Sequence, residues 1–136
     1  VEAIQAWPST QEVRHEPPEL LRRVNPRTFA WFPTGPAAAL APELRQIPNA
    51  VELTGAKVAE ACQGFADLVH SRRVTHPGDP LLDAHVTSAT KFTSGDGWRF
   101  VRRGVGHVDA AYAAAGAVYA LHAIPVEAPA PRSKVF

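Results

Sequence analysis

The residue that could carry catalytic chemistry is an acid at the start of an apolar segment. Asp109 follows the stretch 104–108 (GVGHV) and opens a run, 108–122, that is apolar on nearly all sides. Free backbone N–H groups and the helix dipole favour an acid at such a helix start. A packed helix would also hold a metal-ligating carboxylate in a fixed direction, as two-metal phosphoryl chemistry requires. The residue pattern leaves both interpretations open.

A second group of residues is typical of phosphate binding. Basic and aromatic side chains alternate in part between positions 91 and 103, where the sequence holds Lys91, Trp98, Arg99, Phe100, Arg102 and Arg103. A strand of this kind can follow a phosphate backbone. The alternative is a half-buried strand with a solvated polar face. The formal net charge is only +1, so any nucleic-acid surface must be local.

Other common functional signatures do not occur in the sequence. It contains no GxxxxGK[ST], GxGxxG, HExxH or GxSxG motif. The six histidines are scattered, and we interpret them as structural, including His76 and His85, which come near ligand spacing. Cys62 is the only cysteine, which excludes an intramolecular disulfide and predicts a reducing compartment. No apolar run approaches the 18 residues of a membrane span, so we expect no membrane partner.

The patterning predicts one α/β domain over residues 1–124, followed by a proline-rich tail over 125–136. The 136 residues suffice for one compact core. Predicted helices cover 19–24, part of 36–46, 54–72, 80–90 after an Asp79 cap, and 108–122. Predicted strands cover 3–7, 28–32, 50–53 and 97–103, with Asp96 in the turn before the last. The last helix, apolar nearly all round, should lie between layers.

Three stretches taken in order are similar to a known family. They are 54–65 with its helix, 73–85, and 95–100 continuing to 108–114, preceded by the strand and turn of 29–38. A helix ends in a short basic strand, and a capped helix follows it. A Gly-Asp-x-Trp hairpin strand with arginines comes next, and an Asp then begins an alanine-rich helix. This order resembles the C-terminal nuclease domain of tailed-phage large terminase subunits, especially from phages of actinobacteria. It covers about residues 28–124.

The resemblance implies an RNase H-like layered domain, with a central mixed sheet flanked by helices and an incomplete N-terminal edge. It implies an endonuclease that cuts double-stranded concatemeric viral DNA with two Mg²⁺ or Mn²⁺ ions. Asp109 matches the last of the family's catalytic, metal-binding acids, and we expect Lys91, Arg99, Arg102 and Arg103 to contact DNA. The implied partners are the terminase motor domain, the small terminase subunit and the portal, in the cytoplasm of the bacterial host.

The sequence departs from the family in its other acids. No Asp or Glu lies between Glu19 and Glu43, where the family places an acid at the end of a strand. The family's first-strand acid has no match, and its segment lies before Val1 or is absent. One carboxylate cannot hold two metals, so the alternative is a non-catalytic DNA-binding or docking module on the same fold. A third possibility is an unrelated small α/β domain in which Asp109 only caps its helix.

Overall fold

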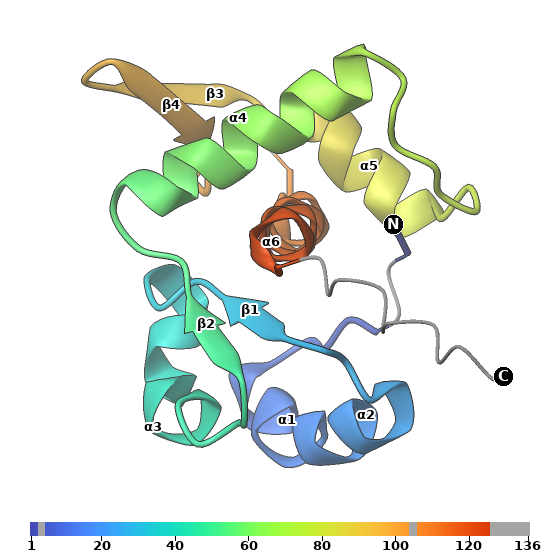
Figure 1. Ribbon diagram of the computed structural model, residues 1–136, viewed down its shortest axis with the longest axis vertical. Helices are drawn as coiled ribbons and strands as arrows, with labels where there is room; N and C mark the ends of the chain where they lie inside the picture. The colour runs from blue at the N-terminus through green and yellow to red at the C-terminus, as the bar shows by residue number, and fades with distance from the viewer. Residues whose placement is uncertain (3–4, 104–105, 126–136) are drawn as a thin grey trace, which may run out of the picture.

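Figure 1 shows the computed structural model of the chain, which describes residues 1–2, 5–103 and 106–125. The described residues form a mixed α/β fold. Its helices are α1 (Thr10–His15), α2 (Pro17–Val24), the 3₁₀ helix η1 (Gly35–Leu40), α3 (Ala41–Leu44), α4 (Ala56–His70), α5 (Pro80–Ser88) and α6 (Asp109–Ala123). Its strands are β1 (Phe29–Trp31), β2 (Ala50–Glu52), β3 (Lys91–Ser94) and β4 (Gly97–Phe100).

Helix α6 passes through the centre of the fold. It packs against α4 and α5 on one side and against β1 on the other (Figure 1). Its buried residues are mostly small, and they are Ala111, Tyr112, Ala114, Ala115, Gly116 and Ala120. Small side chains let neighbouring elements approach the helix closely from several directions. The prediction that this apolar segment lies between layers is confirmed.

The strands form two separate sheets. β1 and β2 pair in parallel with Phe29 opposite Ala50, whereas β3 and β4 form an antiparallel hairpin with Lys91 opposite Phe100. The described residues therefore do not form the single central mixed sheet that the resemblance implies. The physical reason is the position of α6, which lies between the two strand pairs, so that each pair packs beside the helix and cannot extend the other (Figure 1).

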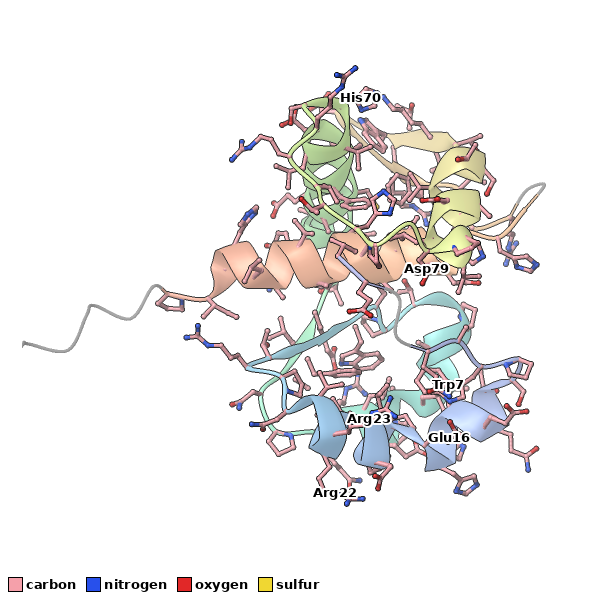
Figure 2. All side chains as sticks on the ribbon, turned by 90° about the vertical axis from the view of Figure 1, so that its right-hand side faces the viewer. Trp7, Glu16, Arg22, Arg23, His70 and Asp79 are labelled. Carbon is pink, nitrogen blue, oxygen red and sulfur yellow. The ribbon has the colours of Figure 1, made fainter. Side chains whose placement is uncertain are left out.

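Two apolar cores hold these layers together. The main core lies between α4, α5, α6 and the hairpin, and Leu53 and Cys62 are its largest fully buried side chains. A smaller core of Trp31, Leu40 and Leu44 lies on the far side of β1 and β2. Helix α1 packs against this smaller core through Val13, and α1 and α2 occupy the opposite end of the molecule from the hairpin (Figures 1 and 2).

Local signals predicted most of the elements. The side chain of Asp79 accepts hydrogen bonds from the backbone of Leu81 at 2.8 Å and Leu82 at 3.3 Å, which confirms the predicted cap. The predicted strand 97–103 ends at residue 100. Residues 5–7 of the predicted strand 3–7 form no strand, while residues 3–4 of that strand and 126–136 of the predicted tail lie outside the described residues.

Within the described ranges, no helix has the length and apolarity needed to cross a bilayer.

Candidate nucleic-acid interface

The β3–β4 hairpin holds two of the predicted DNA-binding side chains over aromatic rings. The Lys91 ammonium lies 4.4 Å from the centroid of the Trp98 ring, and the Arg99 guanidinium lies 5.1 Å from that of Phe92. Every residue of β3 is exposed, and the turn of the hairpin projects from the body of the molecule (Figure 1). Contact with a ring restrains each flexible cationic side chain, of which Lys91 is exposed and Arg99 is half-buried.

The hairpin is positioned by its turn and by α4. Gly95 has φ +59°, a left-handed conformation that glycine adopts without steric cost, so Asp96 lies in a turn as predicted. A Cβ atom on Gly97 would lie 3.2 Å from Nε2 of Gln63, so β4 begins in close contact with α4. The same Gln63 amide donates to the Trp98 carbonyl at 3.4 Å. These contacts hold β4 against α4, whereas β3 stays exposed.

Arg102 is held by intramolecular contacts. Its Nη1 donates to the carbonyl oxygen of Thr34 at 2.6 Å and to the hydroxyl of Thr34 at 3.0 Å. Its guanidinium also lies 4.4 Å from the Tyr112 ring centroid. Gly35, with φ +81°, leaves space for this group, because a Cβ atom there would lie 2.7 Å from Nη1. Arg102 thus joins the segment after β4 to the turn after β1, whereas Arg103 beside it is exposed.

Asp109 is the first residue of α6, and its side chain is exposed. Val108 occupies the N-cap position of α6, and its side chain makes no hydrogen bond to the helix. Instead, Nδ1 of His85 in α5 accepts the backbone N–H of Ala110 at 2.9 Å, and the His85 ring stacks on that of His107 at 5.9 Å. His85 therefore has the structural role predicted for the histidines, although no local pattern identifies its partner.

The metal site implied by the resemblance can be compared with these surroundings. The carboxylate of Asp109 is a suitable oxygen ligand for Mg²⁺ or Mn²⁺. The neighbouring side chains are imidazoles, however, and Nδ1 of His85 already accepts a hydrogen bond. Over residues 1–2, 5–103 and 106–125, no three His, Cys, Asp or Glu side chains converge on a point that could hold an ion. The described residues fit one ligand and not a complete two-metal site, so we derive no step through the metals.

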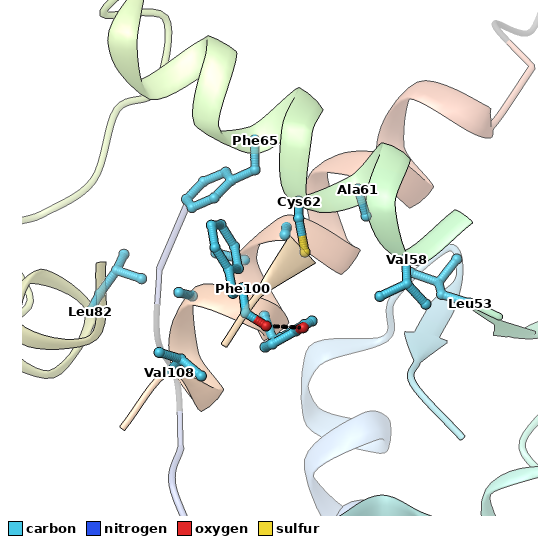
Figure 3. Packing of buried hydrophobic residues seen from close by; sticks show 12 residues of the cluster. Leu53, Val58, Ala61, Cys62, Phe65, Leu82, Phe100 and Val108 are labelled. Atoms are coloured by element: carbon cyan, nitrogen blue, oxygen red, sulfur yellow. Dashed lines mark hydrogen bonds between the residues drawn. The ribbon is translucent and has the colours of Figure 1, made fainter. Parts of the chain in front are cut away.

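Tyr112 connects the start of α6 to the hairpin. Its buried hydroxyl donates to the carbonyl oxygen of Phe100 at 2.7 Å, the dashed line in Figure 3. Its ring packs edge-to-face on Phe32 at 5.1 Å and on Phe100 at 5.6 Å. Burial raises the pKa of Tyr112, Cys62 acts in the same direction, and Arg102 opposes them. The hydroxyl therefore stays a donor near neutral pH, and it ties the end of β4 to the first turn of α6.

The described surface has one hollow away from the hairpin and a smaller one beside it. A hollow of about 350 Å³ between α4 and α6 has Glu60, Tyr119 and His122 at its rim. A smaller one of about 120 Å³ lies beneath Lys91 and Trp98. Asp109 lines neither of them. Lys91 lines the smaller hollow, so the predicted site residues share no enclosing cavity, which suits a large ligand such as a nucleic acid better than a small molecule that needs such a cavity.

No protein-family model, curated protein or solved structure matches this chain. The likeness to terminase nuclease domains rests on the order and spacing of the sequence stretches given above.

Proposed function

We propose that this chain binds double-stranded DNA through its β3–β4 hairpin, as part of the RNase H-like nuclease domain of a phage DNA-packaging terminase. The observation that supports it best is the pair of cationic side chains, Lys91 and Arg99, each held over an aromatic ring on a projecting hairpin. Such groups neutralise phosphates and release condensed counterions. The terminase motor domain, the small subunit and the portal, in the host cytoplasm, are the partners and setting in the same proposal.

The DNA-binding part is tested by the salt dependence of duplex affinity. The change is the double variant Lys91→Gln/Arg99→Gln, and its matched control is Arg22→Gln/Arg23→Gln on α2, at the far end of the molecule (Figure 2). Each lost phosphate contact lowers the slope of log affinity against log salt by about 0.9, so the hairpin variant should lose roughly 2. The control should keep its slope. An unchanged slope in the hairpin variant would contradict the proposal.

The cleavage part assigns Asp109 as one ligand of a divalent metal ion. Its support is the resemblance together with the exposed carboxylate at the start of a buried helix. We expect Asp109→Asn and Asp109→Ala to abolish plasmid cleavage in Mn²⁺, while the exposed turn variant Asp96→Asn keeps it. Cleavage by folded Asp109→Asn at the wild-type rate would overturn this assignment.

The second candidate is a DNA-binding or docking module without cleavage. It is favoured by the start of α6, where His85 accepts the Ala110 N–H and stacks on His107, and where no three potential metal ligands converge within the described residues. Calorimetric titration with Mn²⁺ separates the two candidates. A nuclease should bind Mn²⁺ in a way that Asp109→Asn weakens, whereas the module should bind DNA without either metal binding at Asp109 or cleavage.

A further inference from the structure

Phe92 is an exposed aromatic side chain at the centre of the exposed strand β3. It is 49% exposed, and the other large apolar side chains with comparable exposure in the described ranges are aliphatic. Its cross-strand partner is Arg99, whose guanidinium lies 5.1 Å from the ring. The ring contacts Arg99, and because about half of the side chain is exposed, it also stays accessible to a ligand.

The two faces of the hairpin differ in what they contact. Residues directly opposite each other in an antiparallel pair lie on the same face, and successive residues alternate between faces. Trp98 and Phe100 belong to or pack against the main core. Phe92 and Arg99 form the alternate pair, in which the Phe92 side chain is exposed and the Arg99 side chain is half-buried. This Phe92–Arg99 face therefore presents an exposed ring with a guanidinium 5.1 Å from its centroid.

We infer that this Phe92–Arg99 face binds unpaired DNA bases, with the Phe92 ring as the stacking surface and Arg99 on the neighbouring phosphate. Every base has a π-face, so stacking on an aromatic ring tolerates any sequence, and an adjacent Arg adds a charge contact. The inference rests on the proposed function and names its substrate class: DNA with single-stranded bases, in addition to duplex.

Fluorescence anisotropy with three labelled probes tests the inference. The probes are a single strand of about 16 nucleotides, the duplex of that sequence, and a single strand of the same length that carries abasic sites throughout. Phe92→Leu keeps an apolar side chain but removes the ring. Leu121→Ala, at a side chain 65% exposed on α6, is the matched control. Circular dichroism verifies that both variants are folded.

We expect Phe92→Leu to weaken single-strand binding by about 5- to 150-fold, the range for one stacked base. Its loss of duplex affinity should be much smaller, and its duplex salt slope should stay at the wild-type level because both cations keep their charge. Leu121→Ala should match wild type on all probes. The wild-type protein should bind the abasic strand as weakly as Phe92→Leu binds the natural strand.

Three results would overturn the inference. They are wild-type single-strand affinity in Phe92→Leu, an equal loss on strand and duplex, and equal wild-type affinity for the abasic and natural strands. The proposed function fails on a different result, an unchanged duplex salt slope in Lys91→Gln/Arg99→Gln, so the two failures are distinguishable.

Discussion

The hydroxyl of Tyr112 provides the sharpest test of how the hairpin is joined to α6. The substitution Tyr112→Phe removes one oxygen atom and leaves the ring. The edge-to-face contacts with Phe32 and Phe100 therefore remain, whereas the 2.7 Å hydrogen bond to the Phe100 carbonyl is lost. Because Tyr112 is only 5% exposed, no bulk water replaces the lost donor. The variant measures the cost of an unpaired buried carbonyl.

That cost sets the expected loss of stability. Leaving a buried acceptor unpaired costs about 1–3 kcal/mol in the free energy of unfolding. For a chain of this length, each kcal/mol lowers the melting temperature by roughly 3–5 °C. The control is Tyr119→Phe on the same helix, where the hydroxyl donates to Glu60 at 3.1 Å in an exposed position. A surface change of that kind should cost less than about 0.5 kcal/mol.

Urea unfolding followed by far-ultraviolet circular dichroism gives the free energy of unfolding of each variant, and the slope m checks that the unfolded states are comparable. The difference between the two variants is the informative quantity, since both lose one hydroxyl from α6. Equal losses in Tyr112→Phe and Tyr119→Phe would refute the reasoning, because burial would then make no difference. A negligible loss in Tyr112→Phe would show that the Phe100 carbonyl finds another partner.

Three further predictions concern single positions. Asp79→Ala should cost about 1 kcal/mol in urea unfolding, because two N–H groups lose their acceptor, while Asp79→Asn should keep most of the stability; equal losses would contradict the cap. A Cβ atom on Gly116 would lie 3.1 Å from the Phe32 ring, so Gly116→Val should cost about 1–3 kcal/mol by overpacking, and unchanged stability would show that Phe32 can move. Burial raises the pKa of the Cys62 thiol, so folding favours its protonated form. The free energy of unfolding should therefore stay constant below about pH 8.5 and decrease as the pH rises above it. An equal decrease in the Cys62→Ala variant would show that Cys62 is not its cause.

Elements whose signals are local could be predicted from the sequence. The apolar face of α4 recurs at helical spacing, and Asp79 followed by proline marks the start of α5. Elements with no buried face gave no such signal. Helix α1 buries no residue, and all four residues of β3 are exposed, so neither has the periodicity on which prediction depends.

The pairing of the strands could not be predicted, because it depends on contacts distant in sequence. The short apolar patterns of β1 and β2 are compatible with one large sheet or with two small ones. What decides between them is the path of α6, whose small side chains let β1 pack on one side and α4 on the other. The resemblance supplied the expectation of a central sheet, and the strand patterns offered no means of testing it.

The grouping of basic residues was visible in the sequence, but their separate roles were not. Lys91 is exposed and Arg99 is half-buried, each over an aromatic ring, whereas Arg102 bonds to Thr34, which is 68 positions away in the chain. Neutralising Arg102 should therefore lower stability as well as DNA affinity. The effects of Arg102 and Arg99 on binding must be interpreted together with a stability measurement, while that of the exposed Lys91 can be interpreted directly.

At the start of α6, too, the effect of a substitution on stability can be distinguished from its effect on chemistry. Because His85 already accepts the Ala110 N–H, Asp109 does not serve as the cap of this helix. Its contribution to stability is then limited to its charge near the helix dipole, about 0.3–1 kcal/mol. A carboxylate that contributes so little to folding can be replaced by Asn with the fold retained. Any large effect of Asp109→Asn on Mn²⁺ binding or DNA cleavage must therefore come from its chemistry and not from loss of structure.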